Sequence, residues 1–260
     1  MPGSNERWQI QPSDILWEDE SIIAVNKPAG IPSQPTPDRS RDNCYDAVCR
    51  YLRSKYGDKA YAGLHHRLDV ATSGVILLTS AQAANRAISE QFQNHTIQKT
   101  YCAVCIADDW RLQNAPCRAD LSGSPFEIDA PIGEVPEQKI QKFCVGGKHR
   151  KSAHTGFICE SCIQLRDGCL CVFTCSPHTG RTHQIRVHLS ACGLPIVGDS
   201  LYGMPLLRSL RSIDPRRMCL HAESIAFIHP TTNVPIKITA PRPREFTSFI
   251  VKAGRLAKPS

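Results

Sequence analysis

The spacing of apolar and polar residues predicts a hairpin and a helix in the N-terminal part of the chain. Residues 15–17 and 22–25 are β-prone and flank an acidic turn at 18–20, which is the pattern of two antiparallel strands. Residues 27–30 (Lys-Pro-Ala-Gly) should end the second strand, because proline lacks a ladder donor and glycine tolerates a positive φ. Apolar residues at 45, 48 and 52 predict a helix over residues 45–56.

The next segments alternate between strand and helix patterns. The short apolar run at 75–79 predicts a buried strand. Ser80 is placed to cap a helix whose positions 84, 88 and 92 form one apolar face. Residues 97–106 predict another strand, and residues 107–138 are expected to be loops around short strands.

The C-terminal half is dominated by strand patterns. Residues 157–165 and 169–175 are rich in β-branched, aromatic and cysteine side chains, and the turn between them predicts a hairpin. A short helix is expected over 182–191, ended by Gly193 and Pro195, and residues 219–240 predict two more strands. Strands outnumber helices without regular alternation, so we expect an α+β fold in which a few helices pack on a mixed, mainly antiparallel sheet.

Composition limits the class of protein. The 260 residues are 41% hydrophobic and 21% charged, which is typical of globular proteins. No apolar run approaches the roughly 20 residues that span a bilayer, and the N-terminus does not resemble a signal or transit peptide. The 13 cysteines are an odd number without the spacing of a disulfide framework. We therefore expect a cytoplasmic protein with mostly free thiols and no membrane partner.

Charge is moderately basic and unevenly distributed. The formal net charge is +7, which permits a nucleic-acid partner without requiring one. Residues 139–151 contain five Lys or Arg and no acid, and a second basic group has only Asp214 as counter-charge. Such runs are usually solvated surface, but two of them form a surface to which a polyanion could bind. The second group consists of Arg208, Arg211, Arg216 and Arg217.

Asp69, in the stretch HHRLDVATSG, allows two interpretations. An aspartate before a turn is usually a cap or turn residue. Here Arg67 lies two residues away on the same face of an extended chain, and two histidines precede it. A carboxylate in such surroundings should be ionised and could serve as a nucleophile or base.

A second cluster of cations lies around a glycine turn that opens the predicted helix at 182–191. Helix N-termini and arginine side chains both bind phosphate, although a basic surface helix is an equally good interpretation. Arg181 or Arg186 could be partly buried, and a buried arginine needs an anion, for which Asp69 is a candidate. The cluster consists of His178, Arg181, His183, Arg186 and His188.

Metal and cofactor sites are not expected. The cysteine pairs 102/105 and 159/162 have the C-x-x-C spacing of zinc ligands, but both lie in strand-like sequence. Residues three apart in a regular strand point to opposite faces, so small buried cysteines are the better interpretation. The phosphate-binding, dinucleotide-binding and nucleophile-elbow motifs are absent from the sequence. A zinc-stabilised module over 159–178 stays as an alternative.

Several motifs, in the same order, resemble those of the RluA-type pseudouridine synthases. Residues 66–74 (HRLDVATSG) resemble the family signature H-R-L-D-x-x-T-S-G, and residues 25–30 resemble its first-strand motif V-N-K-P-x-G. Residues 180–188 (GRTHQIRVH), with Gly198-Asp199 and residues 201–203, resemble G-R-T-H-Q-[IL]-R-V-H…G-D…L-Y-G. The matches to K-x-Y and K-x-A-x-T are at 99–101 and 151–155.

The resemblance covers residues 15–242 and implies both a fold and a reaction. The implied fold is a long mixed, mainly antiparallel sheet with flanking helices and a central RNA-binding cleft. The implied reaction isomerises selected uridines of ribosomal or transfer RNA without cofactor or metal. Residues 15–250 would form the catalytic domain, between an extension at 1–14 and a tail at 251–260. We expect a monomer without a separate N-terminal RNA-binding domain.

The resemblance also implies roles for individual residues. Asp69 is the implied catalytic aspartate, Tyr101 would stack on the uracil, and Arg186 would pair with Asp69, with Arg181 as the alternative. A protein that keeps this fold and binds RNA without catalysis remains the rival interpretation. The residues implied to contact RNA are Lys27, His66, Arg67, Thr72, Lys99, Arg181 and His183.

Overall fold

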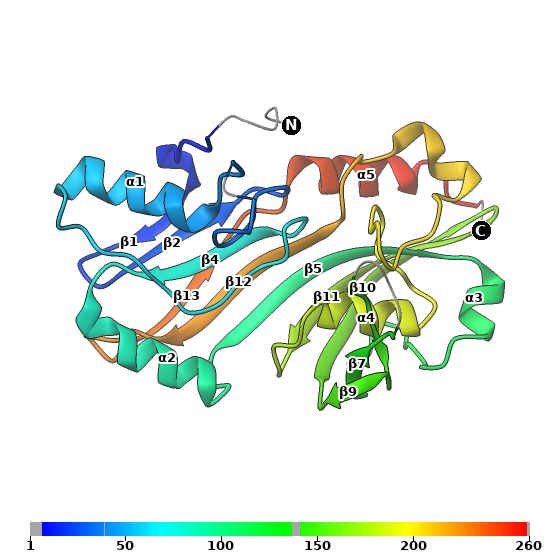
Figure 1. Ribbon diagram of the computed structural model, residues 1–260. Coiled ribbons are helices and arrows are strands. Elements are labelled where there is room, and N and C mark those ends of the chain that lie inside the picture. Colours follow the sequence, from blue (N-terminus) through cyan, green and yellow to red (C-terminus); the bar gives the residue numbers. More distant parts are fainter. Residues whose placement is uncertain (1–6, 39, 137–140, 259–260) are drawn as a thin grey trace. The chain divides into compact units, whose positions relative to one another are not determined.

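The computed structural model describes residues 7–38, 40–136 and 141–258, so parts of the expected N-terminal extension, C-terminal tail and first basic run lie outside the described residues (Figure 1). The chain divides into two compact units. The first comprises residues 1–99 and 222–241, and the second comprises residues 100–221 and 242–260.

The first unit is built on an antiparallel arrangement in which the predicted hairpin is confirmed. Strands β1 (Ile15–Glu18) and β2 (Ile22–Lys27) pair antiparallel, and β2 pairs antiparallel with β4 (Ser73–Thr79). All seven residues of β4 are buried, as the apolar run predicts. The strand order is β1-β2-β4-β12, with β3 on β4 and β13 on β12. The remaining strands are β3 (Gly63–Leu64), β12 (Leu220–Ile228) and β13 (Pro235–Thr239).

Helices α1 (Cys44–Tyr56) and α2 (Asn85–Gln93) flank these strands (Figure 1). In α1 the buried face includes Val48 and Leu52, so the predicted helix is confirmed. Asn43 caps it, because its side chain accepts a hydrogen bond from the amide of Asp46 at 3.0 Å. The helix thus begins one residue before the predicted start.

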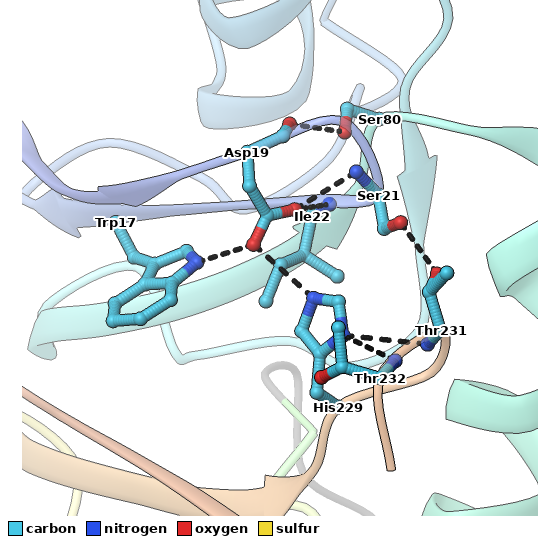
Figure 2. Close-up of polar contacts among 8 residues, drawn as sticks. All are labelled: Trp17, Asp19, Ser21, Ile22, Ser80, His229, Thr231 and Thr232. Carbon is cyan, nitrogen blue, oxygen red and sulfur yellow. Dashed lines mark hydrogen bonds and ion pairs between the residues drawn. The ribbon is translucent and has the colours of Figure 1, made fainter. Parts of the chain in front are cut away.

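The turn between β1 and β2 is organised by one carboxylate (Figure 2). Oδ1 of Asp19 accepts hydrogen bonds from the amides of Ser21 and Ile22 at 2.8 and 2.9 Å. Its Oδ2 accepts from the indole of Trp17 at 2.6 Å and lies 3.1 Å from Nε2 of His229. A single acidic residue therefore closes the hairpin and links it to the end of β12.

Ser80 does not cap α2, so that prediction is wrong. Its hydroxyl donates instead to the backbone oxygen of Asp19 at 3.2 Å, which joins the end of β4 to the β1–β2 turn (Figure 2). A short 3₁₀ turn, Gln82–Ala84, precedes α2, and no side chain caps it. The predicted apolar face of α2 is present, since Ile88 is fully buried.

The second unit contains the other predicted hairpin and several elements that were not expected. Strands β10 (His154–Leu165) and β11 (Gly168–Pro177) pair along their length, and the order is β5-β11-β10-β6. A small sheet has the order β8-β7-β9, and helix α4 (Gln184–Ala191) contacts β8, β10 and β11. The other strands are β5 (Gln98–Ala107), β6 (Phe126–Asp129), β7 (Ile132–Glu134), β8 (Phe143–Val145) and β9 (Lys148–Lys151).

Three helical segments of this unit were not foreseen. Helix α3 (Asp109–Gln113) is a short helix capped by Asp108, whose side chain accepts from the amide of Arg111. Helix α5 (Arg244–Gly254) buries Phe246, Phe249 and Ala253, and it includes the start of the expected C-terminal tail. The third is the 3₁₀ segment Arg208–Ile213.

The α+β class and the mainly antiparallel pairing are confirmed. All 13 cysteines are free thiols in the structure. Across the described ranges, no helix has the length and apolar character needed to cross a membrane. The central RNA-binding cleft stays a prediction.

We expect Asp19→Asn to lower the free energy of unfolding by about 1.5–3 kcal/mol, because an amide cannot accept all four hydrogen bonds. Burial alone would raise the pKa of Asp19, but the hydrogen bonds from Trp17 and two backbone amides lower it overall. The ionised form therefore stabilises the fold above the unfolded pKa of about 3.9, and this contribution is lost as pH falls through the lower folded value.

Urea unfolding at neutral pH and at successively lower pH tests this expectation. Glu20→Gln, in the same turn but exposed, is the matched control and should change stability little. Equal stability of the Asp19→Asn and Glu20→Gln proteins at neutral pH would contradict the role given to Asp19.

Candidate active site

Asp69 opens a tight turn in the first unit. The amide of Thr72 donates to the backbone oxygen of Asp69 at 3.0 Å, so the turn comprises residues 69–72. Ser73 and Gly74 already belong to β4, so the turn lies earlier than the Thr-Ser-Gly sequence suggests. The side chain of Asp69 is half-buried.

Backbone groups on both sides of Asp69 are anchored. The oxygen of Val70 accepts from the amide of Gly30 at 2.7 Å and from Nζ of Lys27 at 3.4 Å. Lys27 is fully buried, and its ammonium group also donates to the oxygens of Pro28 and Ile31 at 3.0 and 2.8 Å. The lysine of the V-N-K-P-x-G motif thus holds the turn after Asp69 in place.

The residue before Asp69 is held by a serine that the sequence analysis missed. Ser33 is buried, and its hydroxyl donates to the oxygen of Leu68 at 2.8 Å and accepts from the amide of Leu68 at 2.9 Å. Nothing in the spacing of the Pro-rich loop identifies this serine. The two contacts hold the backbone before Asp69, and Lys27 holds the backbone after it.

Gly74 is the glycine of the H-R-L-D-x-x-T-S-G signature, and its backbone conformation and close packing explain why this position needs glycine. Its φ is +117°, and an added Cβ would lie 2.2 Å from the backbone oxygen of Ala222. Only glycine permits both this conformation and the close approach of β12 to the start of β4.

The two histidines before Asp69 are neutral rather than cationic. Nε2 of His66 accepts a hydrogen bond from the amide of Leu77 at 2.9 Å, and the ring stacks on Phe92. Burial, with smaller effects of Lys99 and His65, lowers the pKa of His66 to about 3. Burial also lowers the pKa of His65, whose ring nitrogens contact the hydroxyls of Ser89 and Thr79. His65 and His66 therefore do not contribute positive charge near Asp69.

In the second unit, Gln184 organises the loop before α4. Its side-chain oxygen accepts from the hydroxyl of Thr179 at 2.7 Å and from the amide of Arg181 at 3.0 Å. Its side-chain nitrogen donates to the oxygen of His154 and to the hydroxyl of Thr155, both at 2.9 Å. The glutamine of the G-R-T-H-Q motif therefore joins this loop to β10.

His188 extends the same network and is buried rather than available to phosphate. Its Nε2 lies 3.0 Å from the oxygen of Ala130, and its Nδ1 lies 3.0 Å from the hydroxyl of Thr155. Burial lowers its pKa, so the ring is neutral, with one nitrogen donating and the other accepting.

Arg186 projects from α4 into a buried ion pair. Its Nε and Nη2 donate to Oδ2 and Oδ1 of Asp199 at 2.7 and 2.8 Å, in the two-point geometry that favours arginine. The side chains of Arg186 and Asp199 are 6% and 0% exposed. Asp199 also accepts from the amides of Leu201 and Tyr202 at 2.9 and 3.1 Å. A buried arginine does need an anion, as the sequence indicates, and Asp199 is one such anion that no sequence motif identified. The expected pairing of Arg186 with Asp69 stays a prediction.

Tyr202 covers the pair from the L-Y-G motif. The guanidinium of Arg186 lies 5.0 Å from the centre of the Tyr202 ring. The hydroxyl of Tyr202 accepts from the amide of Phe143 at 3.0 Å and lies 2.9 Å from Nδ1 of His183. His183 has a positive φ of 58° and precedes α4, so the helix begins at Gln184 rather than at Thr182.

The other site residues differ in exposure. Arg67 is exposed, and Tyr101 is half-buried on β5. Lys99, also on β5, is half-buried, and burial lowers its pKa. Nε of Arg181 donates to the oxygen of Ser152 at 2.8 Å. Thr72 is 2% exposed. Direct RNA contact through buried Thr72 or Lys27 remains a prediction.

The expected site residues are divided between the two units. Asp69 belongs to the first, as do Lys27, His66, Arg67, Thr72 and Lys99. The second contains Tyr101, Arg181, His183 and Arg186. In both units, motif residues such as Lys27, His66 and Gln184 make hydrogen bonds to backbone groups of other segments.

Comparison with known proteins gives the class to which this site belongs. Residues 21–191 match the family model described as RNA pseudouridylate synthase. The chain is 36% identical over 217 residues to the dual-specificity RNA pseudouridine synthase RluA of Haemophilus ducreyi, covering 83% of this chain and 86% of the relative. It is 31% identical over 255 residues to the ribosomal large subunit pseudouridine synthase D of Zymomonas mobilis subsp. mobilis, covering 94% and 73%.

The chain therefore belongs to the RNA pseudouridylate synthase family, whose members are isomerases that act on RNA. The fold agrees. The human RNA pseudouridylate synthase domain containing 4 protein superposes with a TM-score of 0.68 at 21% identity, covering 95% of this chain and 94% of that one. The fold and family implied by the sequence motifs are thus confirmed.

Asp199→Asn should lower the free energy of unfolding by about 3–5 kcal/mol, since it removes the charge of a buried carboxylate that accepts two hydrogen bonds from the guanidinium of Arg186. Burial would raise the pKa of Asp199, but hydrogen bonds and the charge of Arg186 lower it overall. The contribution of the pair is present above the unfolded pKa of about 3.9 and is lost as pH falls through the folded value.

Urea unfolding measures the difference. The control is Glu90→Gln, which breaks the exposed pair between Arg86 and Glu90 on α2 and should cost no more than about 0.5 kcal/mol. If the two substitutions cost the same, the buried pair does not have the importance assigned to it.

Proposed function

We propose that this protein converts specific uridines of ribosomal or transfer RNA to pseudouridine, with Asp69 as the catalytic carboxylate. The observation that carries the proposal is the turn at 69–72, which is anchored on one side by Ser33 and on the other by Lys27. Such anchoring is the preorganisation that a catalytic side chain requires. The relatives named for ribosomal RNA and for dual specificity support the substrate class.

The proposed reaction acts at the ribose of the target nucleotide. Asp69 either attacks C1′ or removes a proton from C2′ as the N1–C1′ bond breaks. The released uracil turns and C5 forms the new bond to C1′. In the first case this displaces Asp69 from C1′, and in the second case Asp69 returns the proton to C2′. C5 then loses its proton and N1 gains one. Substrate and product have the same atoms and oxidation state, so the chemistry consumes no co-substrate.

The other site residues are given supporting roles. Tyr101 stacks on the uracil and accepts the C5 proton. Arg186 pairs with Asp69 in this proposal, and Asp199 fixes the orientation of the guanidinium through two hydrogen bonds. Arg67, which is exposed, holds the target nucleotide out of its stack, at a cost of a few kcal/mol per unstacked base. A monomeric state and a cytoplasmic location are further parts of the proposal.

Asp69→Asn should abolish pseudouridine formation while leaving the fold and RNA binding intact, because the amide is isosteric but cannot act as a nucleophile or base. The measurement is a pseudouridine map of ribosomal and transfer RNA from cells that lack the wild-type protein and express each variant. Asp58→Asn, an exposed aspartate of the same unit, is the control and should restore the wild-type map.

Modification by the Asp69→Asn protein at the wild-type level would contradict the catalytic role. If even the wild-type protein adds no pseudouridine yet binds RNA with a steep dependence on salt, the non-catalytic alternative is favoured.

Strand β9 is the best placed part of the first basic run to contact RNA. Its residues, Lys148–Lys151, are all exposed. In the second basic group, by contrast, Arg217 is less available to a ligand, because its guanidinium packs on Phe246, with Cζ 5.0 Å from the centre of the ring. We therefore assign backbone-phosphate contacts to β9 rather than to Arg217.

Arg150→Ala should weaken RNA binding at every sequence tested and reduce the slope of log affinity against log salt by about 1, the effect of losing one phosphate contact. Filter binding over a range of salt concentrations measures both quantities. Lys252→Ala, an exposed cation on α5, should leave the slope unchanged. Equal slopes for the wild-type and Arg150→Ala proteins would remove β9 from the RNA-binding surface.

A further inference from the structure

The β10–β11 hairpin brings three thiols together in a way that the family function does not use. Cys162 lies directly opposite Cys171 in the strand register, so their side chains share one face of the hairpin. Cys169 is two residues from Cys171 on β11 and therefore points to the same face. The hairpin lies entirely in the second unit.

The sulfur atoms are close enough to share one ion. Sγ of Cys171 lies 3.0 Å from Sγ of Cys162 and 3.7 Å from Sγ of Cys169, and all three lie within 4.8 Å of one another. Zinc–sulfur bonds of about 2.3 Å in tetrahedral geometry place the ligands about 3.8 Å apart. Small shifts of side chains would bring the three sulfur atoms to that spacing.

A β-bulge changes the expectation drawn from the C-x-x-C spacing. The register shifts between Cys159 and Ser161, so that Cys159 lies opposite Phe173 while Cys162 lies opposite Cys171. Residues 171 and 173 share a face, and Cys159 and Cys162 therefore do so too, although they are three apart. Cys159 and Cys162 thus do not point to the opposite faces that their spacing predicts. That prediction still holds for Cys102 and Cys105, where the register of β5 with β11 is continuous.

The three thiols differ in their access to solvent. Cys162 is half-buried, whereas Cys169 and Cys171 are 2% and 0% exposed. The side-chain amide of Gln164 donates to Sγ of Cys162 at 3.7 Å, as does the thiol of Cys171 at 3.0 Å. An ion would enter at this accessible sulfur and reach the two buried ones.

We propose that Cys162, Cys169 and Cys171 form a binding site for one thiophilic metal ion, of which Zn²⁺ is the best match. Thiolate sulfur selects soft or borderline ions of this kind over Mg²⁺ or Ca²⁺. Binding replaces the thiol protons with metal–sulfur bonds, so one ion joins β10 to β11 close to the turn of the hairpin. The three cysteines belong to the second unit and Asp69 to the first, and the proposal does not depend on the proposed catalytic roles.

The test uses the full-length reduced protein after treatment with a chelator. Zn²⁺ is titrated in competition with a chromophoric chelator, and Co²⁺ is used as a spectroscopic probe for thiolate ligands. We expect one equivalent of Zn²⁺ and a sulfur-to-cobalt charge-transfer band. Cys162→Ser and Cys169→Ser should each weaken binding by at least ~10–100-fold, the loss that follows removal of even a supporting group.

Cys144→Ser is the matched control, because Cys144 is a half-buried thiol of β8 outside the cluster, and it should bind Zn²⁺ like the wild-type protein. Binding that survives Cys162→Ser, or Co²⁺ spectra without the charge-transfer band, would overturn the proposal. Such a result would point to the group of Glu127, His154 and His178 instead. A Cys162–Cys171 disulfide whose reduction restores no Zn²⁺ binding would overturn it as well.

Discussion

The buried pair of Arg186 and Asp199 is the constraint around which the second unit is arranged. A guanidinium and a carboxylate that are both almost inaccessible to solvent are stable only when their geometry is good and their other hydrogen-bonding groups are satisfied. The sequence meets that condition with a run of short motifs. Gly198 has φ of +74° and allows a close approach to the backbone oxygen of Arg217. The amides of Leu201 and Tyr202 donate hydrogen bonds to the carboxylate of Asp199, and the ring of Tyr202 packs against the guanidinium. The G-D and L-Y-G motif residues therefore hold the buried side chain of Arg186 in one orientation.

The first unit uses polar groups for a similar purpose. The buried ammonium group of Lys27 donates to backbone carbonyl oxygens and holds the chain after Asp69. The buried hydroxyl of Ser33 holds the chain before it. Apolar packing could not do this, because a loop presents unpaired backbone groups that need hydrogen-bonding partners. In this fold Lys27 and Ser33 hold the backbone on both sides of the carboxylate that we propose for catalysis.

The proposed metal site differs from these two arrangements, because strand pairing rather than sequence motifs brings its residues together. Its cysteines lie outside the motifs by which the sequence resembles the family. They come together because two strands pair in one register and one strand carries a bulge. A site of this kind would add a cross-link to a long hairpin without altering the residues that act on RNA.

The amino-acid sequence alone determined the hairpins, the buried strand β4, the helices with a clear apolar face and, through ordered motifs, the family. These features depend on local periodicity and on turn residues, which can be seen in a single segment. Only the tertiary structure decided that Ser80 bonds to the β1–β2 turn, that His66 is neutral, that Asp199 pairs with Arg186 and that three cysteines converge. Each of those outcomes depends on which residues from distant segments become neighbours after burial. Burial then decides which side chains stay charged and which must find a partner.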